Sequence, residues 1–153
     1  MSYLKKAAYC GTGAAFASLC TIALLARYEG RDPLQPINAT SHVLWGPQAA
    51  ARSWRDKRHT LAGLLINVGS GYFWGAICAL GTLNRSKPSG AEIVGSALIT
   101  SSIAGGVDYL FVPKRLRPGW ELSLEARHVA IAILAMGAGL AAGGFAAREV
   151  DRR

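Results

Sequence analysis

Residues 60–84 read TLAGLLINVGSGYFWGAICALGTLN, a stretch without a charged side chain that lies between His59 and Arg85. An α-helix rises about 1.5 Å per residue and the hydrocarbon core of a bilayer is about 30 Å thick, so a helix of this length spans a membrane. The stretch therefore predicts a transmembrane helix, and the rest of the chain is interpreted around it.

This stretch has two different sides when it is read at helical spacing. One side gathers its small and polar residues together with the histidine that precedes it, which are His59, Gly63, Asn67, Ser70 and Trp74. Helices in lipid associate through close packing of small residues and through hydrogen bonds between polar groups. We therefore expect this side and the small pair Gly71 and Gly75 to face other helices, and the leucine side to face lipid.

Three further apolar segments reach spanning length, at residues 7–26, 93–112 and 129–147, and Asp108 is the only charged residue within them. Only helices and closed barrels satisfy the backbone in lipid, and these runs are too long and too evenly apolar for barrel strands. The predicted fold class is an all-α polytopic membrane protein, with four spans in an up-and-down bundle that forms one membrane domain over residues 1–153. Because residues 7–26 are long for a signal peptide and lack a clean cleavage motif, we expect a retained helix there.

The composition agrees with a membrane protein: 51% of the residues are hydrophobic, 17% are charged, and the formal net charge is +8. The basic residues stand in loops and tails beside the apolar spans, where anionic lipid headgroups are the expected partner, and this argues against nucleic-acid binding. Cys10, Cys20 and Cys78 lie within predicted spans without CxxC spacing. They are therefore interpreted as small buried residues, not as redox or metal groups.

Two longer connections, residues 27–59 and 113–128, are expected on the same side of the membrane. They carry more Lys and Arg than the opposite side, which favours cytoplasmic loops, whereas Lys5 and Lys6 before the first span favour a cytoplasmic N-terminus. The positive-inside rule therefore leaves the orientation open.

The connections also suggest local structure. Residues 27–38 contain two prolines and are expected to be extended. Residues 47–59, PQAAARSWRDKRH, predict an interfacial amphipathic helix before the second span, with Pro47 in its first turn and basic side chains near the lipid phosphates. Ser123 is expected to cap the last helix.

Four spans in up-and-down order bring both longer connections and the adjoining span ends to one membrane face. The polar residues expected there form the candidate site: His42, His59, His128, Asn38, Asn67, Asp108, Lys114 and Arg115. If the chain has a functional site, this face is where we expect it.

Three interpretations of these residues stay open. In the leading one they are structural, paired with loops and headgroups, and no cofactor is expected. In the second, His59, Asn67 and Asp108 line the path of a small channel or proton-coupled transporter, because ionisable groups within membranes often do so. In the third, His42, His59 and His128 bind haem or a metal ion, although no HxxxH or HExxH spacing is present. No GxSxG motif occurs either, so an enzyme is not favoured.

Three motifs in order, SHVLWG at 41–46, HTLAG with FWG at 59–75, and DYLFVPKRLRPGWE at 108–121, resemble a group of small four-helix bacterial inner-membrane proteins. The resemblance covers about residues 36–121 and implies a bacterial inner-membrane location and the four-span architecture, without a mechanism. Members of that group carry further histidines where this chain has Asn67 and Val68, which weakens the metal interpretation here.

Together these features predict a non-enzymatic accessory or scaffold component of the inner membrane. Its expected partners are membrane lipids and either further copies of itself or other membrane subunits.

Overall fold

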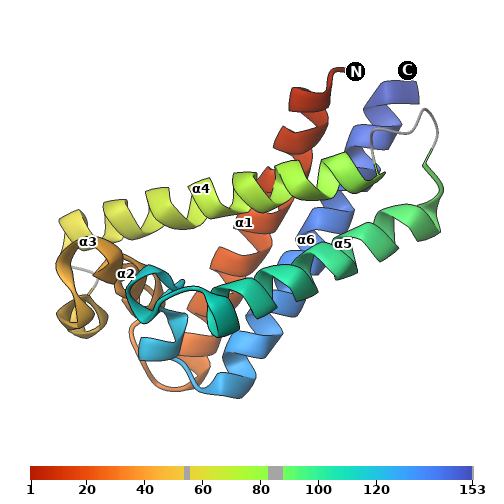
Figure 1. Ribbon diagram of the computed structural model, residues 1–153. Coiled ribbons are helices and arrows are strands. Elements are labelled where there is room, and N and C mark those ends of the chain that lie inside the picture. The colour runs from red at the N-terminus through yellow and green to blue at the C-terminus, as the bar shows by residue number, and fades with distance from the viewer. Residues whose placement is uncertain (54–55, 83–87, 153) are drawn as a thin grey trace. The chain divides into compact units, whose positions relative to one another are not determined.

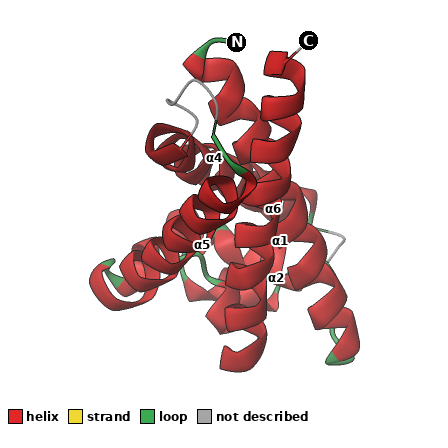
Figure 2. Ribbon diagram, turned by 90° about the vertical axis from the view of Figure 1, so that its right-hand side faces the viewer, coloured by secondary structure: helices red, strands yellow, loops and turns green. Residues whose placement is uncertain are grey.

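A computed structural model describes residues 1–53, 56–82 and 88–152, and every regular element among them is helical (Figure 2). The long helices in Figure 1 are α1 (Tyr3–Tyr28), α4 (Lys57–Thr82), α5 (Gly90–Gly106) and α6 (Ala126–Arg152). A π-helical segment, η2 (Val107–Phe111), continues α5. With that extension, four helices are long and apolar enough to cross a membrane, which confirms the predicted all-α, four-span architecture.

The helices extend beyond most predicted span ends by about one turn. α4 begins at Lys57 and α6 at Ala126, three residues before the apolar runs that predicted them. A long basic side chain can remain in a helix at the membrane edge while its charged end reaches the headgroups. The last two residues of the predicted span 60–84 lie outside the described part of the chain.

The connections are built from short helices: α2 (Gln35–Thr40), α3 (His42–Trp45), η1 (Pro47–Ala51), η3 (Lys114–Leu116) and η4 (Trp120–Leu122). The prediction of an extended segment over residues 27–38 is therefore wrong at both ends, because Arg27 and Tyr28 belong to α1 and α2 begins at Gln35. Pro36 stands in the first turn of α2, where its missing N–H costs no helical hydrogen bond.

The interfacial helix predicted over residues 47–59 is not continuous. A 3-10 turn begins at Pro47 as expected, but it ends at Ala51, and Arg52 is extended with φ −80° and ψ 137°. The carbonyls of Arg52 and Ser53 accept hydrogen bonds from the Asn38 side chain, and the Ser53 carbonyl also accepts the Asp56 backbone N–H at 3.0 Å, which forms a single turn before α4. Residues 54 and 55 of this prediction lie outside the described residues.

Contacts divide the chain into two compact units, which are described separately. The first comprises Met1–Ser18, Val68–Ala104 and Ile133–Arg153, and we call it the glycine unit. The second comprises Leu19–Asn67 and Gly105–Ala132, and we call it the loop unit.

Helices of the glycine unit approach one another closely at glycines. A Cβ atom at Gly75 would lie 2.4 Å from the backbone nitrogen of Gly11, and one at Gly143 would lie 2.2 Å from the carbonyl oxygen of Tyr9. α4 and α6 therefore both pack against the backbone of α1, and the expectation that Gly75 faces another helix is confirmed. The two chain ends lie close together (Figure 1), and Lys6 Nζ near one end lies 3.0 Å from Asp151 Oδ2 near the other.

The two sides of α4 mostly follow the prediction. The predicted helix-facing residues His59, Gly63, Asn67 and Trp74 are buried, and Leu61 and Leu65 are exposed. Ser70 departs from this pattern because no neighbouring described segment covers it, so its side chain is exposed.

Candidate functional site

All the predicted site residues fall in the loop unit, at positions within Leu19–Asn67 and Gly105–Ala132. They differ in burial. The buried ones are Asn38, His42, His59, Asn67 and His128. Asp108 is half-buried, and Lys114 and Arg115 are exposed.

Asn67 links α4 to both connections. Its Nδ2 donates to Thr40 Oγ1 at 2.9 Å and to the Gly63 carbonyl at 2.8 Å, and its Oδ1 accepts from Trp120 Nε1 at 3.1 Å. Both donor hydrogens and one acceptor site of the amide are thus engaged within the chain. The side chain holds α2 and η4 against α4.

Asn38 fastens α2 to the segment before α4. Its Nδ2 donates to the carbonyls of Arg52 and Ser53, and its Oδ1 accepts from Thr60 Oγ1 at 2.7 Å. α2 also lies directly on α4, because a Cβ atom at Gly63 would stand 1.9 Å from the Ile37 carbonyl oxygen. Asn38 and Gly63 therefore place the first connection against the start of the second span.

His42 lies between two carbonyl oxygens. Its Nδ1 is 3.0 Å from the Ala39 oxygen and its Nε2 is 3.2 Å from the Lys114 oxygen. A neutral imidazole donates from one nitrogen only, so only the doubly protonated ring satisfies both contacts. Gly119, at φ 83°, covers this ring so closely that a Cβ there would lie 2.7 Å from Nδ1. Because a metal ligand needs a nitrogen lone pair aimed at the ion, this arrangement does not suit metal binding.

His59 belongs to the N-terminus of α4. Asp56 Oδ1 accepts the His59 backbone N–H at 3.3 Å and caps the helix, and His59 Nδ1 lies 2.9 Å from Asp56 Oδ2, although the ring N–H is not aimed at that oxygen. The nearby His59 ring lowers the pKa of Asp56 below its usual value, against a smaller opposing effect of burial. The Trp45 ring lies 4.7 Å from the His59 ring, and the Arg58 guanidinium stacks 4.5 Å from the Trp45 centroid.

His128 pairs with Glu29 across the start of α6. Its Nδ1 contacts Glu29 Oε1, which also accepts the Glu125 backbone N–H at 3.2 Å. Burial raises the pKa of Glu29, but the hydrogen bonds from His128 and Glu125 outweigh it and hold that pKa below the usual 4.5. Glu29 therefore supplies an anion to the α6 N-terminus, where the helix dipole favours one. The expected cap, Ser123, instead donates its hydroxyl to the Trp120 carbonyl.

Asp108 lies in the π-helical segment at the end of the third span, where Val112 N–H donates to the Val107 carbonyl at 2.9 Å. Single π-turns are frequent at functional sites. No ion pair joins Asp108 to Lys114 or Arg115 within the described chain. Two side-chain oxygen atoms, Tyr109 Oη and Glu121 Oε2, are buried without a hydrogen-bond partner among the described residues.

The three histidines thus have separate partners. Within residues 1–53, 56–82 and 88–152, no group of three or more His, Cys, Asp or Glu side chains is arranged to hold a metal ion. What the loop unit brings together instead is a set of amide, hydroxyl and indole groups around Asn38 and Asn67.

Sequence reasoning missed three of these partners: Glu29, Thr40 and Trp120. Only Trp120 carried a usable signal, because an indole N–H next to a tight Pro-Gly turn requires a hydrogen-bond acceptor once it is buried. Thr40 and Glu29 belong to a connection whose folding the local pattern did not predict. Comparison of the chain with protein-family models, curated proteins and solved structures gives no match.

Proposed function

We propose that this chain is a multi-pass protein of the bacterial inner membrane that acts as a non-enzymatic accessory or scaffold component, alone or in a larger assembly. The observation that carries the proposal is the internal use of the polar side chains in the loop unit. Asn38, His42 and Asn67 each direct their polar atoms to groups of the same chain. Their contacts suit a rigid membrane-face structure more than a site that exchanges ligands.

This internal bonding has an energetic reason. A buried amide that loses its partner costs about 1–3 kcal/mol, so satisfied networks specify one arrangement of the segments that they join. A scaffold requires such a fixed surface, because a partner subunit binds more tightly to a surface that needs no ordering.

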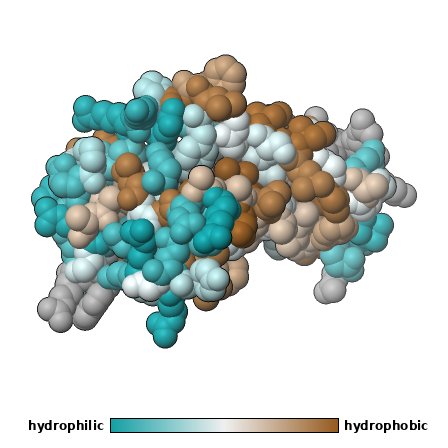
Figure 3. Space-filling model, turned by 90° about the horizontal axis from the view of Figure 1, so that it is seen from below, coloured by the Kyte–Doolittle hydropathy of each residue, from teal (hydrophilic) through white to brown (hydrophobic). Residues whose placement is uncertain are grey.

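The outer faces of the spans supply area for lipids or partner subunits. Large apolar side chains are exposed on all of them, among them Phe16 at 71%, Leu65 at 64%, Ile99 at 62% and Leu134 at 62%. Figure 3 shows hydrophobic residues at the surface over one part of the molecule and hydrophilic residues over another. In a bilayer these apolar faces contact acyl chains or neighbouring spans.

Native mass spectrometry of the full chain, released gently from its own membrane, tests the proposal. We expect a second copy or another membrane subunit to be released with it, and the association to survive replacement of His59 by Ala. Release as a bare monomer in every mild detergent would contradict a scaffold role. An added mass of haem or of a stoichiometric metal, lost with His59→Ala or His128→Ala, would overturn the proposal in favour of a cofactor protein.

One observation favours a second candidate function, proton-coupled transport: buried side-chain oxygen atoms near Asp108 lack hydrogen-bond partners among the described residues. A carboxyl group in a π-turn beside unpartnered Tyr109 and Glu121 atoms has the chemistry of a proton relay. Liposomes containing the purified chain would then dissipate an imposed pH gradient, and Asp108→Asn would abolish the flux. Equal flux in protein-free liposomes would eliminate this candidate.

A further inference from the structure

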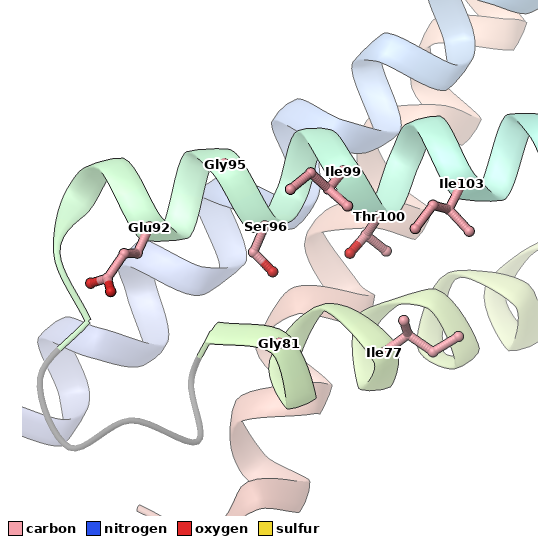
Figure 4. A pocket seen from close by; sticks show the side chains of 8 residues that line it. All are labelled: Ile77, Gly81, Glu92, Gly95, Ser96, Ile99, Thr100 and Ile103. Carbon is pink, nitrogen blue, oxygen red and sulfur yellow. The ribbon is translucent and has the colours of Figure 1, made fainter.

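Two of the grooves in the glycine unit differ in charge. The groove along α5, of about 440 Å³, is lined mainly by apolar and small residues such as Ile77, Gly95 and Ile99 (Figure 4). Glu92 is the one charged residue among the described residues that line it. Its carboxylate accepts the Ser89 backbone N–H at 2.8 Å at the start of α5, so this charge is already engaged within the chain.

The second groove, of about 640 Å³, lies between the first residues of the chain and the last turn of α6, and we call it the α1–α6 groove. Its volume lies within the range of about 300–1,000 Å³ that ligand sites occupy. Lys5, Ala8 and Tyr9 are three and four residues apart on α1, so they share one face of that helix. The groove is lined by Met1, Lys5, Ala8, Tyr9, Val150 and Asp151.

The α1–α6 groove contains a cation that no carboxylate neutralises. Asp151 Oδ2 lies 3.0 Å from Lys6 Nζ, and Asp151 Oδ1 contacts the amino group of Met1. Lys5 is exposed and forms no hydrogen bond or ion pair with any other residue that the structure describes. Because Asp151 is held by Lys6, the ammonium group of Lys5 remains available to a ligand.

Tyr9 supplies a second donor close to the edge of the span. The uncharged run of the first span begins at Ala7, so Lys5 falls at the level of the headgroups and the Tyr9 backbone lies about 6 Å deeper. Helical side chains lean toward the N-terminus of their helix, which brings the Tyr9 phenol back toward the level of Lys5. Tyr9 is 39% exposed, and its hydroxyl has no hydrogen-bond partner within the described part of the chain.

We propose that the α1–α6 groove binds an anionic phospholipid of the phosphatidylglycerol class. Its phosphate lies beside Lys5 and Tyr9, and its acyl chain begins over Ala8 and Val150. An ammonium group and a phenol hydroxyl both donate hydrogen bonds that phosphate oxygens accept. A headgroup that carries its own ammonium binds less well, because that charge is repelled by Lys5.

The apolar part of the groove selects a lipid over a free phosphate ion. Ala8 and Val150 offer no polar atom to an ion, whereas an acyl chain gains by contact with them. The inference requires a chain embedded in a membrane but no partner subunit. It therefore fails or holds separately from the scaffold role.

Two lysines allow a matched test of the charge. Lys5→Gln removes the ammonium group at an exposed position. Lys57 is also exposed in the first turn of a spanning helix, but it belongs to the loop unit and does not line the α1–α6 groove. Lys57→Gln therefore lowers the net charge by the same amount at a different span edge.

Two alanines allow a matched test of the acyl contact. Ala8 is exposed and lines the groove, so Ala8→Leu fills it without entering the packed interior. Ala142 is exposed on α6 and lies outside the lining of the groove, so Ala142→Leu adds the same side chain elsewhere on the unit.

The experiment equilibrates the full chain with vesicles that contain equal amounts of phosphatidylglycerol, phosphatidylethanolamine and phosphatidylcholine, followed by native mass spectrometry. We expect the unchanged chain to retain one phosphatidylglycerol in preference to the other two lipids. Lys5→Gln should lower the affinity for it about tenfold, as expected when a hydrogen bond between charged groups is lost. Ala8→Leu should also lower it about tenfold, because about two methylene groups are displaced. Lys57→Gln and Ala142→Leu should leave it unchanged.

Four results would overturn the inference. An unchanged chain without preference for phosphatidylglycerol would remove the role of Lys5. Equal losses in Lys5→Gln and Lys57→Gln would indicate a general attraction between a basic chain and anionic lipid. Undiminished retention in Ala8→Leu would place the bound lipid elsewhere. Displacement of the lipid by inorganic phosphate alone, with the same dependence on Lys5, would assign the groove to a soluble anion.

Discussion

The glycine unit and the loop unit hold their segments together by different means. In the glycine unit, helix backbones touch where side chains are missing, as at Gly75 against Gly11. In the loop unit, amide side chains such as Asn67 cross from one segment to another through hydrogen bonds. The contrast shows that spans in lipid are stabilised by the close approach of their backbones. Connections at the membrane face instead need directional hydrogen bonds to fix their irregular backbone.

The largest loss in the free energy of unfolding is expected from a substitution that disrupts the glycine unit. Gly143→Leu places a Cβ atom 2.2 Å from the Tyr9 carbonyl oxygen, so α6 must move away from α1. We expect a loss of about 3 kcal/mol or more in the free energy of unfolding, measured by SDS titration in mixed micelles. Gly69→Leu is the control, because its side chain meets open space. Equal stability of the two variants would refute backbone-to-backbone packing as the basis of this unit.

The next largest loss in the free energy of unfolding is expected from a substitution in the loop unit. Asn67→Leu keeps a similar volume but leaves the Trp120 indole N–H without its acceptor. We expect a loss of about 2–3 kcal/mol in the same titration. Combining it with Trp120→Phe should cost less than the sum of the single changes, because the two residues share one bond. Strict additivity would show that the bond contributes nothing to stability.

A smaller effect on stability is expected at the start of α6 when the pH is lowered. The pKa of Glu29 is lowered in the folded chain. At pH values above its usual pKa of 4.5, the ionised carboxylate therefore stabilises the start of α6. That contribution is lost as the pH falls through the lowered pKa. We expect amide exchange at Glu125 to lose protection in this acid range, before amides in the middle of α6 do.

Two variants test the assignment of this acid step. Glu29→Gln should remove the pH dependence of protection at Glu125 and leave the α6 start less protected at neutral pH. Glu125→Gln is the matched control, because its exposed side chain pairs with Arg127 at 2.8 Å while its backbone N–H still donates to Glu29. Retention of the acid step in Glu29→Gln would assign it to another group.

The smallest effect is expected at Ser70, the α4 residue whose exposure departs from the helical pattern. Ser70→Leu changes an uncovered position, so the free energy of unfolding should shift by no more than about 0.5 kcal/mol. The same SDS titration measures it. A loss comparable to that of Asn67→Leu would mean that another segment covers Ser70 in the membrane.

The sequence predicted the spans well, and the connections less well. Continuous apolar length located α1, α4, α5 and α6 because crossing a bilayer is a property of one segment alone. The prolines near Gln35 suggested an extended backbone, yet one of them starts α2. Local propensity failed there because α2 is held by α4, through Gly63 and the Asn38 side chain.

The candidate site shows the same limit. The polar residues were found from their types and positions, and all of them fall in the loop unit. Their partners were not found, since Trp120 is 53 positions from Asn67 and Glu29 is 99 positions from His128. Asp108 forms no ion pair with Lys114 or Arg115 among the described residues, and both of these basic side chains are exposed.

By itself the sequence determined that this is an all-α chain with four helices of membrane-spanning length, because hydrophobic length and helical spacing are local properties. Only the tertiary structure decided what each buried polar group does, because hydrogen-bond partners are chosen by the approach of distant segments.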